Sequence, residues 1–84
     1  MAYIDIIWDL DDDPAGNVRH IADHGLTKDD VRWVLENPLR REESWSSGRP
    51  MVYGYTPDDV YVVVIYEQVD EQTVYPVTAY EIEE

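Results

Sequence analysis

The chain contains no cysteine and no phenylalanine, and its 84 residues include only six lysines and arginines. Without cysteine it forms no disulfide, no thiolate metal site and no cysteine nucleophile, and a reducing compartment suits it. No 18 apolar residues stand together, and no basic segment leads into an apolar run near the start, so we expect neither a membrane-spanning helix nor an export signal. We therefore expect a cytoplasmic protein without a membrane partner.

Acidic residues dominate the charge, because 19 Asp and Glu leave a net charge of −13. This charge repels phosphate backbones at long range and weakens non-specific binding to nucleic acids. A general DNA or RNA binder is therefore not expected. Five of the six cations are arginines, however, and Arg40, Arg41 and Arg49 lie within ten residues of one another, which leaves room for a local anion site.

The apolar content is high enough for a folded domain. Hydrophobic residues make up 44% and aromatic residues 12% of the chain, more than a disordered segment carries. A chain of this length builds one modest core that buries about two-thirds of the surface of the open chain. We predict that residues 1–84 form a single small α+β domain.

The first third of the chain predicts a strand followed by a short helix. Residues 3–8 are mostly branched and aromatic, which favours a largely buried strand. Asp13 followed by Pro14 is typical of an N-cap and a first helical position, so we predict that the first helix begins there. Gly25 supplies the left-handed residue that ends many helices, which keeps this one short.

A second helix is predicted at residues 27–37. Thr27 and Asp30 have the spacing of a capping box, with Asp in the usual Glu position, and apolar residues follow at helical spacing. Pro38 cannot continue the helix, because it lacks the N–H and its ring clashes with the preceding turn. The chain therefore turns at this point.

Everything after this turn is predicted to be strand. Residues 40–45 and 50–56 read as a hairpin, residues 60–66 are the most β-prone run and hence the central strand, and residues 73–82 form the last strand. Pro76 has no N–H for the ladder and so predicts an edge or a bulge. The predicted fold is α+β with the order β-α-α-β-β-β-β, in which two short helices pack on one face of an antiparallel meander sheet.

The face of the sheet without helices needs another kind of cover. The central strand is apolar at nearly every position, which is typical of a strand buried on both faces. Seven tyrosines and no phenylalanine indicate rings that are packed on their faces but hydrogen-bonded or wet at their hydroxyls. We expect a protein partner or self-association through the tyrosine-bearing sheet face or a strand edge. The predicted binding residues are Tyr53, Tyr55, Tyr61 and Tyr75.

His20 and His24 are the only histidines, and their spacing on a helix resembles that of zinc-binding pairs. No third ligand is identifiable beside them, and no Glu follows His20 in the order that a metalloprotease helix needs. The alternative for His24 is a histidine stabilised by the dipole at a helix C-terminus. We therefore predict no metal site and keep these two residues as the candidates for one.

Arg49 follows a polar turn, and its planar guanidinium suits a carboxylate or a phosphate. Together with His24 and Thr78 it would make an anion or phosphodiester site. The arginine would stabilise charge, the imidazole would transfer a proton and the hydroxyl would orient the substrate. With 19 acids in the chain, a structural ion pair is the alternative use of Arg49.

Short motifs that follow one another along most of the chain carry a family resemblance. They are Ile7-Trp8-Asp9, His24-Gly25-Leu26-Thr27, Glu36-Asn37-Pro38, the residues Arg49, Gly54 and Thr56, Val62-Val63-Val64 with Tyr66, and Val77-Thr78-Ala79. In this order they resemble the BrnT family of small bacterial ribonuclease toxins, which have a RelE-like fold. The resemblance implies this fold for the chain.

The same resemblance implies a toxin-type endoribonuclease of a toxin–antitoxin system that acts on RNA with His24, Arg49, Thr78 and Tyr80. The family carries arginines around its last strand, where this chain has Tyr75 and Tyr80. RNA binding needs cations, and both these replacements and the net charge of −13 work against it. We therefore predict a non-catalytic protein-interaction module that needs no cofactor, with the ribonuclease as the alternative.

Overall fold

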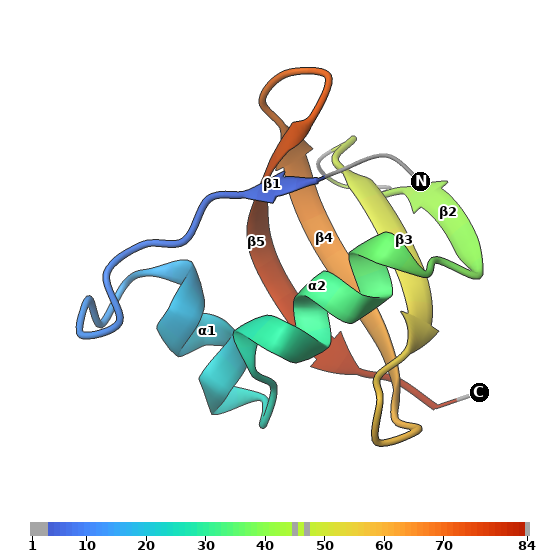
Figure 1. Ribbon diagram of the computed structural model, residues 1–84, viewed down its shortest axis with the longest axis horizontal. Coiled ribbons are helices and arrows are strands. Elements are labelled where there is room, and N and C mark those ends of the chain that lie inside the picture. The colour runs from blue at the N-terminus through green and yellow to red at the C-terminus, as the bar shows by residue number, and fades with distance from the viewer. Residues whose placement is uncertain (1–3, 45, 47, 84) are drawn as a thin grey trace.

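The computed structural model describes residues 4–44, 46 and 48–83, which form two helices and a five-stranded sheet (Figure 1). In chain order the elements are β1 (Asp5–Ile6), α1 (Asn17–Asp23), α2 (Lys28–Glu36), β2 (Arg40–Glu43), β3 (Pro50–Tyr55), β4 (Tyr61–Gln68) and β5 (Thr73–Glu81). The α+β class is confirmed. Three residues of predicted elements lie outside the described residues: Tyr3 of the first strand, Trp45 of the hairpin and Ser47 of the polar turn before Arg49. Neither helix in the described ranges is long and apolar enough to cross a membrane.

The sheet has the strand order β1-β5-β4-β3-β2, so β4 is its central strand, as predicted. Strands β2 to β5 form the expected antiparallel meander. β1, however, pairs with β5 in parallel, so the sheet is mixed and the prediction of an antiparallel sheet is wrong for this strand. The physical reason is that no tight turn joins β1 to its neighbour. The chain between β1 and β5 runs through both helices and strands β2 to β4, so no hairpin imposes an antiparallel pairing.

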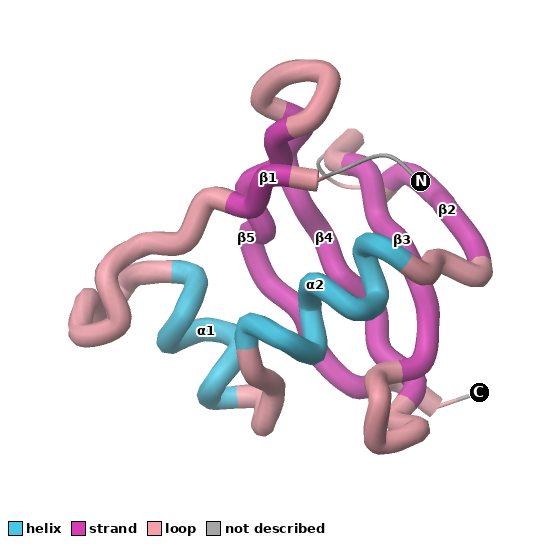
Figure 2. The backbone as a smooth tube through the Cα atoms, in the orientation of Figure 1, coloured by secondary structure: helices cyan, strands magenta, loops and turns pink. Residues whose placement is uncertain are grey.

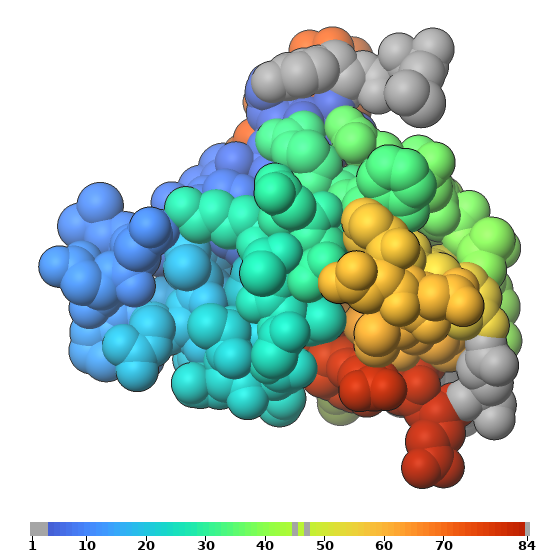
Figure 3. Space-filling view, turned by 60° about the horizontal axis from the view of Figure 1, so that its bottom comes forward, coloured from blue at the N-terminus to red at the C-terminus, as the bar shows by residue number. Residues whose placement is uncertain are grey.

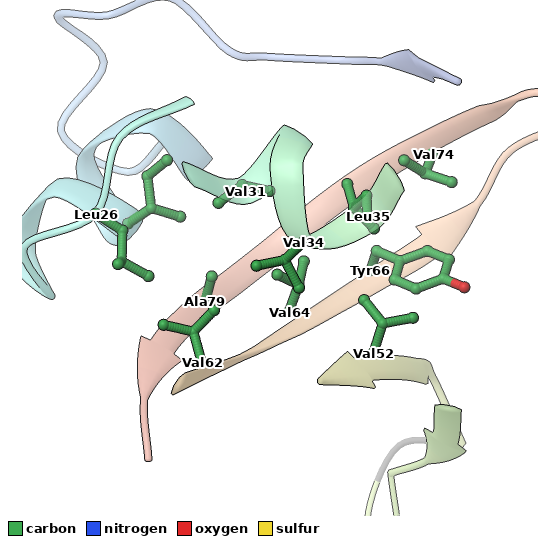
Figure 4. Close-up of a cluster of buried hydrophobic side chains, with 11 residues drawn as sticks. Leu26, Val31, Val34, Leu35, Val52, Val62, Val64, Tyr66, Val74 and Ala79 are labelled. Atoms are coloured by element: carbon green, nitrogen blue, oxygen red, sulfur yellow. The ribbon is translucent and has the colours of Figure 1, made fainter. Parts of the chain in front are cut away.

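The core lies between the helices and one face of the sheet. α2 crosses over β4 and β3, and α1 lies beside β5 (Figure 2). Buried apolar side chains fill the space between these layers (Figure 4): Ile21, Leu26, Val31, Val34, Leu35, Val52, Val62, Val64, Tyr66, Val74 and Ala79. Each fully buried Val, Leu or Ile side chain stabilises the fold by about 1.5–3 kcal/mol, which is why the helices hold to this face.

The boundaries of α2 agree with the prediction. The Asp30 N–H donates to Thr27 Oγ1 at 3.1 Å, and the Thr27 N–H donates to Asp30 Oδ2 at 3.0 Å, so the capping box is confirmed. The helix ends at Glu36, with Asn37 as its C-cap. Gly25, after α1, has a φ of +78°, which confirms the left-handed stop.

The start of α1 differs from the prediction. The helix begins at Asn17 with Gly16 as its N-cap, not at Asp13 and Pro14. Asp13 closes a preceding turn instead, because its Oδ1 accepts from the Ala15 N–H at 2.9 Å and its carbonyl accepts from the Gly16 N–H at 3.0 Å. A Cβ at Gly16 would lie 2.7 Å from Asp9 Cβ, so only glycine permits this approach. Tertiary contact with Asp9 therefore overrides the local capping signal.

Asn17 joins three segments through a buried side chain that is 1% exposed. Its Nδ2 donates to the carbonyls of Ile7 at 3.0 Å and Pro76 at 2.9 Å, and its Oδ1 accepts from the Asp9 N–H at 2.9 Å. Its own N–H donates to Asp9 Oδ2 at 2.9 Å. The amide thus closes the outer edge of β5 beyond the short β1 strand.

The bulge predicted at Pro76 is confirmed. Thr78 lies opposite Ile65, but Pro76 lies opposite Tyr66, so Val77 is the extra residue on β5. Proline has no N–H to donate, and a bulge removes the need for one. The edge alternative does not apply, because β5 lies between β1 and β4.

Replacing Asn17 with alanine tests the anchor. Asn17→Ala leaves two carbonyls and one N–H without their partner, and we expect the free energy of unfolding to fall by about 2–4 kcal/mol. Denaturant titration measures it. The matched control is Asn37→Ala, at an exposed residue whose Nδ2 donates to the Trp33 carbonyl at 3.0 Å, where we expect a loss below about 1 kcal/mol. Equal losses at the two positions would contradict the anchor role.

Candidate functional site

The open face of the sheet, which carries no helix, holds three neighbouring tyrosines. Tyr55 lies opposite Tyr61 with ring centroids 5.0 Å apart, and the Tyr53 and Tyr61 centroids are 6.3 Å apart. We call Tyr53, Tyr55 and Tyr61 the tyrosine cluster. Val63 points to the same face, with Tyr53 and Tyr80 as its register partners, and is only 2% exposed. The tyrosine rings therefore shield much of the open face of the central strand from water.

Arg40 and Glu42 of β2 border the tyrosine cluster. The Arg40 guanidinium lies 4.3 Å above the Tyr53 ring centroid, and its Nε is 3.0 Å from Glu42 Oε2. The Tyr53 hydroxyl donates to Glu42 Oε1 at 3.3 Å. Contact with Tyr53, followed by the charge of Glu42, raises the pKa of Arg40. This arginine is held over the ring by residues of its own chain, as a cation–π contact.

Two shallow hollows flank Tyr55 and Tyr61. One, of about 410 Å³, is lined by Tyr55, Asp59, Val60, Tyr61, Glu81 and Ile82. The other, of about 370 Å³, is lined by Leu39, Arg40, Tyr55, Tyr61, Ile82 and Glu83. Figure 3 shows the end of β5, in red, beside the turn that follows β3, in orange. Both hollows are lined by Tyr55 and Tyr61, and three acidic residues, Asp59, Glu81 and Glu83, line them as well.

His24 and Tyr80 are brought together at the side of the sheet where α1 lies. Their ring centroids are 5.8 Å apart, although His24 follows α1 and Tyr80 is on β5. Thr78 lies two positions before Tyr80 and on the same face, since their register partners are Ile65 and Val63. An imidazole, a phenol and a hydroxyl therefore share this part of β5.

Arg49 lies elsewhere on the sheet. Its Nε donates to Glu67 Oε1 at 3.1 Å, and its Nη2 is 3.1 Å from the same oxygen. The register puts Arg49 level with Glu67 and Tyr80 level with Val63, a difference of four residues along β4, or roughly 13 Å. The predicted residues thus divide into a His24–Tyr80 pair and an Arg49–Glu67 ion pair, which is the structural use anticipated as an alternative.

Tyr75 is separate from the tyrosine cluster. Its hydroxyl donates to Asp9 Oδ2 at 2.6 Å, the same oxygen that accepts from the Asn17 N–H. This bond, together with burial, raises the pKa of Tyr75 to about 12. The same bond, followed by that from Asn17, lowers the pKa of Asp9. Tyr75 therefore belongs to the Asn17 anchor, a role that the sequence did not signal because Asp9 and Tyr75 are 66 residues apart.

The two histidines point to different surroundings. His20 is exposed on α1, and its charge contributes to the lowered pKa of Asp9, whereas the His24 ring contacts Tyr80. Within residues 4–44, 46 and 48–83, no three side chains of His, Asp or Glu gather as metal ligands would. The described arrangement offers aromatic stacking, hydrogen bonding and proton transfer as its chemistry.

The bond between Tyr75 and Asp9 predicts a dependence on pH. The pKa of Asp9 is lower in the folded protein than its ordinary value of 3.8. The ionised Asp9 therefore stabilises the fold fully at pH values above 3.8, and this stability is lost as the pH falls through the pKa of the folded state. Tyr75→Phe removes the largest cause, so we expect the pKa of Asp9 to rise toward 3.8. Carboxyl NMR titration measures this pKa directly.

Tyr80→Phe is the matched control, because the Tyr80 ring contacts His24 instead of Asp9. It should leave the pKa of Asp9 unchanged, and denaturant titrations should show Tyr75→Phe destabilising the fold less at pH 3 than at pH 6. An Asp9 pKa that is the same in all three proteins would contradict this assignment.

Comparisons of the chain with protein-family models, curated proteins and solved structures gave no significant match. The resemblance to the BrnT family therefore stays a prediction from its motifs. What the residues themselves establish is a sheet with an aromatic open face, an imidazole–phenol pair at one side and acidic residues at the two hollows.

Proposed function

We propose that this protein is a non-catalytic interaction module that binds a basic protein partner in the cytoplasm through the open face of its sheet. The observation that carries the proposal is the tyrosine cluster, because two of its rings, Tyr55 and Tyr61, line two shallow hollows together with acidic residues. The cluster belongs to adjacent strands of the meander, so its rings are held on a rigid platform.

Tyrosines in such a position suit a protein interface. A Tyr ring offers a large apolar area at low cost in side-chain entropy, and its hydroxyl keeps a polar handle at the rim. Tyr53, Tyr55 and Tyr61 are all only partly buried in the chain. A partner that covers the rings would remove the remaining apolar surface from water, which is the driving force of association.

Charge favours a basic partner. Asp59, Glu81 and Glu83 border the hollows, and Arg40 is already engaged by Glu42 and Tyr53. The net charge of −13 would steer a cationic protein toward the chain and repel an acidic one. Lysines or arginines of the partner would pair with these acidic residues, and its apolar side chains would meet the rings.

Alanine substitution in the tyrosine cluster tests this function. Immobilised protein is incubated with bacterial lysate, and bound proteins are quantified by mass spectrometry for the wild type, Tyr55→Ala and Tyr61→Ala. We expect basic proteins held by the wild type to lose about tenfold or more in affinity on both variants. Thermal unfolding of each variant checks that it is folded.

Trp33→Ala is the matched control, because Trp33 is an exposed aromatic residue on α2, an element packed on the opposite face of the sheet. It should retain the same proteins as the wild type. Binding at the tyrosine cluster would be refuted if the wild type and all three variants retained the same lysate proteins equally. It would also be refuted if the retained proteins were not enriched in basic ones.

The alternative function is a toxin-type endoribonuclease on a BrnT- or RelE-like scaffold, and the contact between His24 and Tyr80 is the observation that favours it. An imidazole can transfer protons near neutral pH, and a phenol beside it can donate or accept a hydrogen bond. Thr78 lies on the same face of β5 and would orient a phosphate. The resemblance also assigns Arg49 to this function, but Glu67 holds its guanidinium away from the His24–Tyr80 pair.

Controlled expression in a bacterial host separates the two functions. For the interaction module we expect unchanged growth and intact total RNA at confirmed soluble expression. Growth arrest with RNA cleavage that is lost in both His24→Ala and Tyr80→Phe would instead establish the ribonuclease. Arg49→Ala in the same assay shows whether that arginine takes part, and RNA integrity on a gel is the readout.

A further inference from the structure

The two edges of the sheet differ in how they are covered. Along β5, the β1 strand pairs with Thr73 and Val74, and the Asn17 side chain takes the Pro76 carbonyl. Along β2, no element of the described chain pairs with the outer side, and all four of its residues are exposed. Figures 1 and 2 show β2 at the outer margin of the sheet. β2 is therefore the open edge of this sheet.

The hydrogen bonds between β2 and β3 show which backbone groups of β2 point outward. The Ser44 N–H donates to the Arg49 carbonyl at 2.7 Å, and Ser44 lies opposite Arg49 in the same register that places Arg40 opposite Tyr53. Residues of an antiparallel strand alternate between bonding their neighbour and facing away, so Arg40 and Glu42 bond to β3. The N–H and C=O groups of Arg41 and Glu43 then face away from the sheet and are available to another strand.

The four residues of β2 are Arg40, Arg41, Glu42 and Glu43, and the two whose backbone groups face outward, Arg41 and Glu43, carry opposite charges. Charged edges commonly keep strands of separate molecules apart, but opposite charges placed across from each other stabilise a strand pair. We propose that β2 pairs antiparallel with β2 of a second copy of this chain, with Glu42 opposite Glu42 of that copy. Arg41 then lies opposite Glu43 of the second copy, and Glu43 lies opposite its Arg41.

This register follows from symmetry and from the backbone. A two-fold axis perpendicular to the sheet relates the copies, so only residues on the same face can lie opposite each other. The chosen register joins Arg41 and Glu43 by four backbone hydrogen bonds, and each central Glu42 is neutralised by its own Arg40 at 3.0 Å. Of the two neighbouring registers, one would oppose Arg41 to Arg41 and needs the Leu39 N–H, which already donates to the Tyr53 carbonyl at 2.8 Å. The other would oppose Glu43 to Glu43, a pair of like charges.

The pairing goes beyond the function proposed above and does not depend on it. It extends two five-stranded sheets into one of ten strands, with both tyrosine clusters on the same side. Four-residue strands bury less surface than the roughly 1,200 Å² of a stable complex, and each chain carries a charge of −13. The dimer is therefore weak and concentration-dependent at a salt concentration of about 0.15 M, where charges are screened beyond about 8 Å.

Charge reversal at β2 tests the pairing. Sedimentation equilibrium of the wild type should show the mass rising with concentration from 9.8 kDa toward twice that value. Arg41→Glu places Glu opposite Glu twice and Glu43→Arg places Arg opposite Arg twice, so each alone should associate about tenfold or more weakly. An equal mixture of the two variants restores both opposite-charge pairs and should associate again, as should the double variant R41E/E43R.

Arg19→Glu and Asp12→Arg are the matched controls, since they make the same charge changes at exposed residues outside the sheet and should dimerise like the wild type. A wild type that stays at 9.8 kDa up to about 1 mM overturns the proposal. So do single variants that associate as strongly as the wild type, or a mixture that stays monomeric. Loss of binding at the tyrosine cluster leaves these outcomes untouched, because Arg41 and Glu43 lie on the other face.

Discussion

The burial of one amide side chain holds the two halves of this domain together. Asn17 begins α1, yet its hydrogen bonds go to the segment after β1 and to the carbonyl at the β5 bulge. A buried amide is favourable only when its donors and acceptors are paired, and here the side chain meets three partners. The position of α1, the path of the chain after β1 and the closure of one sheet edge all depend on this pairing.

With both helices on one face, the sheet becomes two-sided in its chemistry. The helix-bearing face is filled by aliphatic side chains and Tyr66, whereas the open face carries tyrosine rings around Val63. Rings with hydroxyls satisfy both the apolar strand beneath and the water above, which aliphatic side chains would not. This division explains how a chain of 84 residues with two helices buries Val62, Val63 and Val64 at the middle of the central strand, on both of its faces.

Local signals predicted the elements whose causes lie within a few residues. The Thr27–Asp30 capping box, the stop at Gly25 and the bulge at Pro76 each depend on backbone groups near in sequence or on a missing N–H. The start of α1 was mispredicted for the opposite reason. Asp13 and Pro14 form a good local signal, but the exchange of hydrogen bonds between Asp9 and Asn17 outweighs it.

For the site, the seven tyrosines and the face without helices predicted an aromatic surface, and the 19 acids predicted acidic surroundings, although Tyr66 lies in the core under the helices. The tertiary structure alone decided their grouping. It placed Tyr75 with Asp9, His24 beside Tyr80 and Arg49 with Glu67. The sequence by itself determines the hydrophobic periodicity, the helix caps and the turns, because these depend on interactions between residues close together in the chain. Strand register and the parallel pairing of β1 join residues far apart in the chain, and only the packed fold sets which of them meet.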